Sequence, residues 1–289
     1  MKSKFQIVHH QLFGRLVEAL AATDGYVRTH KMKNKCVFCG LSLSGNKSKE
    51  HIFPRWVQER YGLSDEGLLQ THFSENGEVI SDRHHSLNKH VSGRVCLNCN
   101  NGWMSELEVA AKSLITQLAE SIIDLYQLGS SDCFTIAKWA TKTAYALHSA
   151  SNYRKIIPLG HYHHLASDKI SLPTGVWVFA FQHQCTQPFE WWQSTQWHIE
   201  AEESIITDEF LSKVKNTAYR ISFSIKDLAL IVVNNPFPFM QLVLLKGVHY
   251  PLYPERGPVY WYERNGFPKD NTHGACVGLM AAMGLKQKE

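Results

Sequence analysis

The chain has 289 residues, of which 44% are hydrophobic and 19% charged, a composition typical of a folded globular protein and unlike that of a disordered one. No run approaches the roughly eighteen consecutive apolar residues of a membrane span, which argues against an integral membrane protein. The N-terminus, MKSKFQIVHHQLFGRLVEAL, lacks the unbroken apolar centre of a secretory signal. We therefore expect a cytoplasmic protein with no membrane partner.

Positive charge is concentrated at the start of the chain. The net charge is +4, but Met1–Arg60 holds eleven Lys or Arg and four Asp or Glu, a local net charge of about +7. Such a region would attract a polyanion. A solvated basic face without a ligand explains the same pattern and stays an open alternative.

Residues 8–23 place apolar side chains at helical spacing and predict the first helix. The segment KCVFCG then predicts a short strand fragment that closes on a glycine turn. After a loop rich in Lys and Ser, Pro54 predicts the start of another helix, with Trp56, Val57 and Tyr61 on one side. Residues 62–92 are polar and predict an irregular insertion with one strand-like fragment at 78–80.

A long helix is predicted from about 103 to 127, because Ser105 and Glu108 match a capping box and an apolar stripe continues to Ile122. A second helix is predicted at 134–150. Beyond Pro158, segments rich in β-branched and aromatic residues predict an antiparallel sheet. These segments are 175–183, 190–199, 218–225, 228–234 and 239–246.

Seven cysteines divide into two kinds. Two Cys-x-x-Cys pairs, Cys36/Cys39 and Cys96/Cys99, supply four thiolates, the ligand set of a tetrahedral zinc ion. The remaining three are isolated and typical of small core residues: Cys133, Cys185 and Cys276. Redox or core cysteines are the alternative for the pairs. Because four thiolates leave no open coordination position, this zinc would be structural.

The residues beside the cysteines suggest chemistry. Glu50 and His51 follow the first pair after a short loop, and Asn100 follows Cys99 directly. The ordered text C-V-F-C, E-H-I-F-P and C-L-N-C-N resembles the HNH, or ββα-metal, nucleases, in the branch braced by a four-cysteine zinc. The resemblance covers about residues 35–112.

That resemblance implies a role for each matching residue. Glu50 takes the place of the metal-binding acid, His51 of the general base, and Asn100 of the second protein ligand of a catalytic Mg²⁺ or Mn²⁺. A hard divalent ion prefers such oxygen ligands and stabilises the charge that develops on phosphate during hydrolysis. Lys47, Lys49 and Arg55 beside this site are candidate phosphate contacts, or else ordinary surface cations.

The expected fold is therefore α+β: a zinc-stapled ββα-metal (HNH) module with flanking helices, followed by a C-terminal antiparallel β-rich region. We expect an N-terminal domain at 1–127 and a region of unknown fold at 128–289 that recognises substrate or partner, although the helices on both sides of the boundary could pack on the sheet as one body.

Structural explanations compete with several of these assignments. Asn100 could be a helix N-cap, and His51 a core histidine or a spare metal ligand. Trp56 and Trp103 are expected to pack against the zinc knuckle, and the strand WWQSTQW to pack in the sheet instead of stacking on bases. His84-His85 and the cluster His161, His163 and His164 could bind metal or DNA, but a solvated loop is favoured for both.

The leading functional hypothesis is a metal-dependent endonuclease that cuts DNA, with a role in phage defence or restriction, and with partner proteins there, suggested by analogy alone. A catalytically inactive zinc module that binds nucleic acid or protein is the alternative. Glu50 in place of the family's usual Asp, and Val91 where Asn is common, favour that alternative. A ribonuclease would use the same site on RNA.

Overall fold

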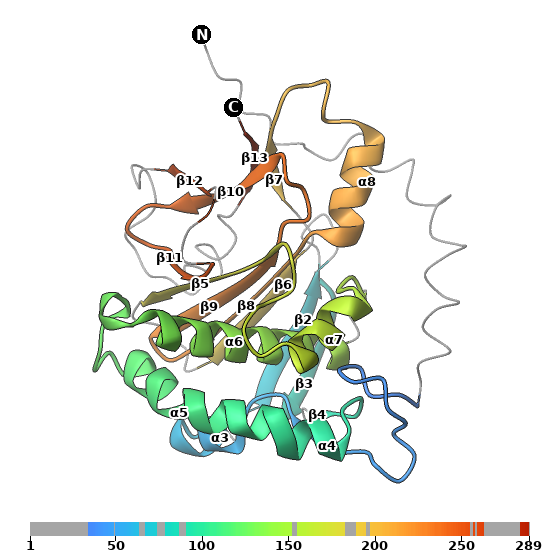
Figure 1. Cartoon of the computed structure of the whole chain (residues 1–289), viewed down its shortest axis with the longest axis vertical. Helices are drawn as coiled ribbons and strands as arrows, with labels where there is room; N and C mark the ends of the chain where they lie inside the picture. Colours follow the sequence, from blue (N-terminus) through green and yellow to red (C-terminus); the bar gives the residue numbers. More distant parts are fainter. Residues whose placement is uncertain are drawn as a thin grey trace.

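The computed structural model describes most of the chain from residue 34 onward. The described residues are 34–48, 50–63, 67–73, 79–86, 91–151, 155–182, 189–194, 197–254, 257, 259–262 and 284–288. The helix predicted at 8–23 lies outside them. In the described part, helices cover one face of a five-stranded sheet and a four-stranded sheet covers the other (Figure 1). None of the described helices combines the length and hydrophobicity needed to cross a lipid bilayer.

The N-terminal segment contains two short strands and a helix. Strand β1 (Glu50–His51) pairs antiparallel with β4 (Val91–Ser92), so that Glu50 lies opposite Ser92 and His51 opposite Val91. Helix α3 (Arg55–Arg60) begins directly after Pro54, as predicted.

The insertion between these strands is not irregular throughout, which corrects the prediction. It contains a hairpin of β2 (Gly67–Phe73) and β3 (Val79–Ser86). Strand β3 is polar at six of eight positions, and β2 is polar at three of seven without strict alternation, so neither strand shows the alternating apolar pattern that identifies a half-buried strand. The Asn76-Gly77 dipeptide between them is a strong hairpin signal that could have revealed the turn. His84 and His85 lie in β3, not in a loop.

The helical segment after β4 begins earlier and ends earlier than predicted. It consists of α4 (Leu97–Cys99), η2 (Asn100–Met104) and α5 (Ser105–Ala119), with non-helical backbone angles at Gly102. Since Gly102 interrupts the helix, the predicted start near 103 agrees with this kink. Ile122, which was assigned to the apolar stripe, lies beyond the end of α5 and is 63% exposed.

The predicted capping box is wrong. Ser105 already has helical backbone angles, φ −63° and ψ −43°, so it cannot act as the N-cap. The Glu108 side chain does not reach back to Ser105 but binds Lys142 of the next helix. Tertiary contact thus determines the position of this carboxylate, and the local motif does not.

Helix α6 (Ser130–Ala150) matches the helix predicted at 134–150 and starts four residues earlier. It is buried along most of its length because it lies between α5 and the five-stranded sheet, where the Trp139 ring centroid is 5.9 Å from that of Phe223. Helices α7 (Leu159–Ser167) and α8 (Asp208–Thr217) were not predicted. Residues 125–127, predicted as the end of the long helix, form a separate helical turn, η3 (Leu125–Gln127).

The larger sheet confirms the predicted antiparallel arrangement, with strand order β11-β5-β9-β8-β6 and antiparallel pairing throughout. Its strands are β5 (Val176–Gln182), β6 (Phe189–Ser194), β8 (Tyr219–Ile225), β9 (Leu228–Asn234) and β11 (Tyr250–Tyr253). Trp191 of β6 packs against the apolar core, as predicted for the WWQSTQW segment.

A second sheet of mixed direction departs from the single antiparallel sheet that was predicted. Its order is β12-β10-β13-β7, and the outer pairs β10/β12 and β13/β7 are parallel. Its strands are β7 (His198–Glu200), β10 (Met240–Leu245), β12 (Val259–Tyr262) and β13 (Gly284–Gln287). Segment 190–199 is divided between the two sheets, since β6 and β7 belong to different ones.

Two apolar clusters hold the layers together. The first extends from the cysteine segment through α5 and α6 to the inner face of the five-stranded sheet, where Phe53 contacts Phe189 with ring centroids 4.3 Å apart. The second lies between the two sheets and includes Phe181 and Leu244. The cysteine segment therefore packs directly on the core beneath the sheet.

Candidate metal centre

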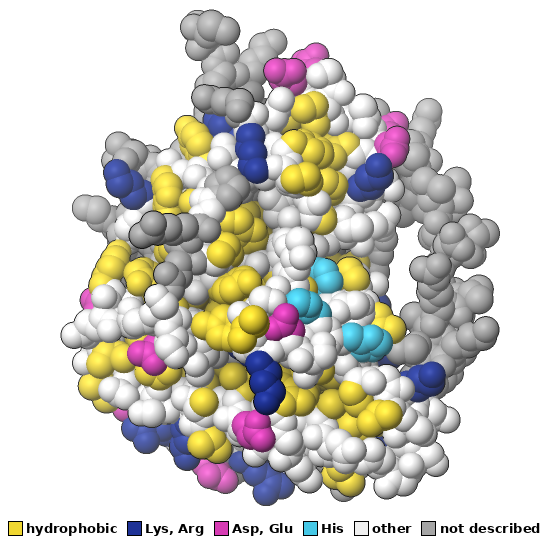
Figure 2. Space-filling view, viewed as in Figure 1, with side chains coloured by type: hydrophobic (Ala, Val, Ile, Leu, Met, Phe, Trp, Pro, Cys, Tyr) yellow, Lys and Arg dark blue, Asp and Glu magenta, His cyan; other side chains and the backbone are white. Residues whose placement is uncertain are grey.

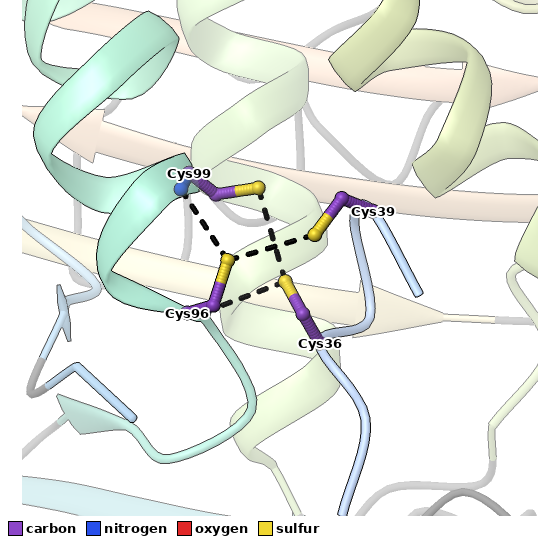
Figure 3. Close-up of side chains that lie close together, drawn as sticks. All are labelled: Cys36, Cys39, Cys96 and Cys99. Carbon is purple, nitrogen blue, oxygen red and sulfur yellow. Dashed lines mark hydrogen bonds between the residues drawn. The ribbon is translucent and has the colours of Figure 1, made fainter. Parts of the chain in front are cut away.

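Four cysteine sulfurs lie together, as the two Cys-x-x-Cys pairs predicted. The ligand atoms of Cys36, Cys39, Cys96 and Cys99 all lie within 4.8 Å of one another (Figure 3). The sulfurs of Cys36 and Cys99 are 3.8 Å apart, and those of Cys39 and Cys96 are 3.5 Å apart. Four thiolates about 2.3 Å from a tetrahedral zinc ion lie about 3.8 Å apart, so the observed separations fit zinc.

The two pairs come from segments that are distant in sequence, and a turn or a helix start brings the two cysteines of each pair together. Cys36 and Cys39 lie on a tight turn in which the Gly40 N–H donates to the Cys36 carbonyl at 2.9 Å. Gly40 has a φ of +74°, which favours glycine at this position. The second pair opens α4, where Cys96 is the N-cap and its sulfur accepts from the Cys99 N–H at 3.4 Å.

The thiols of the cluster differ in acidity. The hydrogen bond between the Cys36 and Cys99 sulfurs lowers the pKa of Cys36 to about 4 and raises the pKa of Cys99. Burial raises the pKa of Cys39 to about 11. Without a metal, Cys39 and Cys99 therefore hold their protons at neutral pH. A zinc ion that binds all four sulfurs as thiolates must release these protons.

Aromatic packing fixes the first pair against the rest of the molecule. Phe38, between the two cysteines, is fully buried, and its ring centroid lies 5.6 Å from that of Trp103 and 5.3 Å from that of Tyr162. The prediction that Trp103 packs against the knuckle is confirmed. Trp56 packs elsewhere, since it contacts Trp139 and lies under the Lys112 ammonium.

His51 lies at the edge of this module, on β1. Its Nε2 accepts a hydrogen bond from Arg55 Nε at 3.4 Å, and its Nδ1 is buried with no hydrogen-bond partner. Burial lowers the pKa of His51 below its usual 6.5, the Arg55 charge lowers it further, and Glu108 opposes both. His51 is therefore neutral at pH 7, the form that can accept a proton.

Asn100 is not a helix N-cap, which corrects that alternative. It has helical backbone angles three residues into the segment that Cys96 caps. Its Nδ2 donates to Asn101 Oδ1 at 3.4 Å, and its own Oδ1 accepts no hydrogen bond among the described residues. An amide oxygen in this state is available to a cation. No hydrogen bond within the described part joins Asn100 to His51.

The other predicted site residues are placed to different extents. Only the backbone of Glu50 is described, and Lys49 lies outside the described residues. Lys47 is exposed, forms an isolated bridge with Cys96, and its side chain passes close to Gly93. Arg55 is exposed, and its Nε donates a hydrogen bond to His51.

Two residues near His51 were not predicted as part of the site. Glu108 acts electrostatically on His51, and its Oε1 lies 2.6 Å from the Nζ of fully buried Lys142. The sequence signal that could have found this pair is Lys142, the second lysine in the apolar run AKWATKTAYAL, because a lysine on a buried helix needs a charged or polar partner.

Comparisons of this chain with protein-family models, with curated proteins and with solved structures find no match. The four-cysteine cluster is the one group of three or more His, Cys, Asp or Glu side chains in the described part that is close enough to hold a metal ion. It is consistent with a zinc module, and any functional assignment must be argued from the residues themselves.

Proposed function

We propose that this protein is a metal-dependent HNH-type endonuclease that hydrolyses phosphodiester bonds in DNA, with a structural zinc bound by the four cysteines. The observation that carries the proposal is the position of His51 beside that cluster. The strand that bears it is paired with β4, which leads directly into Cys96 and the helix that follows. A zinc ion would therefore hold the strand of His51 and the helix of Asn100 in one unit.

His51 suits the role of general base. Its burial and the Arg55 charge keep it neutral at pH 7, so it can take the proton of an attacking water. The Arg55 guanidinium, which donates to His51 Nε2, also places a positive charge where a phosphate would approach. Lys47, exposed on the adjoining loop, is a second candidate phosphate contact.

A divalent Mg²⁺ or Mn²⁺ fits the remaining residues. The free Oδ1 of Asn100 and the carboxylate of Glu50 are oxygen donors of the kind that these ions prefer. When bound, such an ion would stabilise the negative charge that develops on the phosphate and on the leaving oxygen. A contribution to restriction or phage defence is proposed by analogy with other HNH-bearing proteins.

Incubation of supercoiled plasmid with the zinc-loaded protein and Mg²⁺ or Mn²⁺ tests the proposal. We expect nicked or linear product from the parent protein and none from His51→Ala. The matched control is His198→Ala, which removes an exposed histidine on β7 and should cut as the parent does. The same assay with structured and single-stranded RNA distinguishes a ribonuclease.

One observation favours the second candidate, a zinc module that binds nucleic acid or protein without cutting it. Arg55 donates a hydrogen bond to His51 Nε2, and the Nδ1 of the same ring is buried. Arg55 must therefore move away from Nε2 before His51 can accept a proton there. Binding of plasmid in a mobility-shift assay, with no cleavage under any divalent metal, would support this candidate and contradict the nuclease.

A further inference from the structure

Helix α7 lies beside the zinc knuckle and carries three of the histidines that the sequence analysis singled out. They were assigned to a solvated loop, but all three lie on a helix, and histidine side chains gather over α7 on the face seen in Figure 2. The contact with the knuckle is close at two consecutive positions. Tyr162 packs on Phe38, and a Cβ on Gly40 would lie 3.9 Å from His163 Nε2.

His163 differs from its neighbours in its hydrogen bonding. His161 Nδ1 pairs with the Tyr219 hydroxyl at 2.9 Å, and His164 Nε2 pairs with Ser171 Oγ at 3.0 Å. The Nε2 of His163 is buried with no partner among the described residues. A buried polar atom without a hydrogen bond costs about 1–3 kcal/mol, so His163 Nε2 calls for a further partner.

Gly40, which lies close to His163, follows the most exposed cysteine of the cluster. Gly40 directly follows Cys39, and Cys39 is exposed whereas the other three cysteines are buried. Water or a competing chelator therefore reaches Cys39 first, and loss of zinc should begin at its sulfur. When zinc binds, Cys39 becomes a thiolate, which is a charged hydrogen-bond acceptor, and the imidazole that lies near the following residue, Gly40, lacks an acceptor for its Nε2.

We propose that His163 is a positioning residue of the zinc centre, which donates its Nε2–H to the Cys39 thiolate and keeps this exposed ligand on the metal. The same helix also binds Tyr219 of β8 through His161, so α7 connects the knuckle to the five-stranded sheet. The HYHH segment of α7 therefore supports the zinc centre without supplying a zinc ligand. This inference depends on zinc binding alone and not on nuclease activity.

Zinc release into a chromogenic chelator tests this role in the full chain. His163→Leu removes the donor, and we expect zinc to leave about 10–100 times faster, the usual cost of removing a group that supports a metal ligand. His163→Gln keeps an N–H donor at the end of a side chain of similar reach and should restore most of the retention. His164→Leu is the matched control, because His164 bonds to Ser171 and should release zinc at the parent rate.

A spectrum separates a hydrogen bond from mere packing. In the cobalt-substituted protein, loss of a donor to a thiolate should move the sulfur-to-cobalt charge-transfer band to longer wavelength in His163→Leu, while His163→Gln stays near the parent position. Parent-like release and an unmoved band in His163→Leu would overturn the proposal. If that variant does not fold, the parent protein loaded with an NMR-active cadmium isotope decides instead. A scalar coupling between the metal and the His163 Nε2 proton supports the hydrogen bond, and its absence rejects it.

Discussion

Lys142 Nζ lies 2.6 Å from Glu108 Oε1, and the two partners differ in exposure. The Lys142 side chain is fully buried on α6, whereas 23% of the Glu108 side chain on α5 is exposed. Loss of the partner should therefore cost the buried lysine more free energy than it costs the partly exposed glutamate. A lysine without its carboxylate would stay in the core, but a glutamate without its lysine could still be hydrated.

Glu108→Ala should consequently destabilise the protein more than Lys142→Met. We expect the first to cost about 3–5 kcal/mol, since it removes a carboxylate that lies 2.6 Å from a fully buried ammonium, and the second about 1 kcal/mol or less, since methionine fills a similar volume. The double variant should resemble Lys142→Met. Urea unfolding monitored by tryptophan fluorescence measures these differences. Equal costs for the two single variants would contradict the asymmetry.

Removal of zinc should destabilise the N-terminal segment by several kcal/mol, because the ion joins two segments about sixty residues apart that are otherwise held together by a few backbone hydrogen bonds and apolar packing. We expect a strong chelator to lower the melting temperature, and Cys96→Ser to abolish stoichiometric zinc. Cys133→Ser is the control, since this cysteine is buried at the start of α6, outside the cluster. Full zinc content in Cys96→Ser, or none in Cys133→Ser, would contradict the assignment.

Local spacing was enough to predict the features that depend on local chemistry. The four cysteines follow from ligand spacing, and the helix after Pro54 follows from the position of that proline. Helix α6 and strands β5, β6, β8 and β9 of the larger sheet follow from hydrophobic pattern and composition, whereas strand β11 was not predicted. The hairpin β2/β3 could not be found in this way, because β3 is polar at most positions and β2 does not alternate strictly between apolar and polar residues.

Tertiary contacts account for what the sequence could not show. Glu108 matched a capping motif, yet its carboxylate binds Lys142 across two helices. Arg55 was expected to contact phosphate, but its guanidinium donates a hydrogen bond to His51, four residues earlier in the chain. Among the histidines of α7, His161 pairs with Tyr219, His164 pairs with Ser171, and His163 Nε2 has no partner among the described residues. These differences depend on the elements that pack around that helix.

The nuclease proposal makes a prediction for the pH dependence of cleavage. His51 must be neutral to act as a base, and burial and Arg55 lower its pKa below 6.5. The rate should therefore stay high as the pH falls through 6.5 and decline only at lower pH. His51→Ala should reduce the rate about 10²–10⁴-fold. In Arg55→Gln one cause of the lowered pKa is gone, so the acid limb should move to higher pH. An acid limb that moves to lower pH would contradict this electrostatic role of Arg55.

A second histidine, His148, supports the fold and not the site. It is 1% exposed at the end of α6, where its Nδ1 pairs with Gln193 Oε1 at 2.9 Å and its Nε2 accepts from the Ile156 N–H at 3.1 Å. These contacts require the neutral ring. Burial lowers the pKa of His148 to about 4.

Stability should therefore fall in acid through His148. Between about pH 6.5 and pH 4 the unfolded chain takes up a proton at this ring and the folded chain does not, so the contribution of His148 is complete above about pH 6.5 and is lost as the pH falls toward 4. His148→Gln should be less stable at neutral pH but lose up to about 3 kcal/mol less than the parent on acidification. Urea unfolding of both proteins across this range measures the difference, with His198→Ala as a control that removes an exposed histidine. Identical pH slopes for parent and His148→Gln would mean that the buried ring takes up its proton without unfolding.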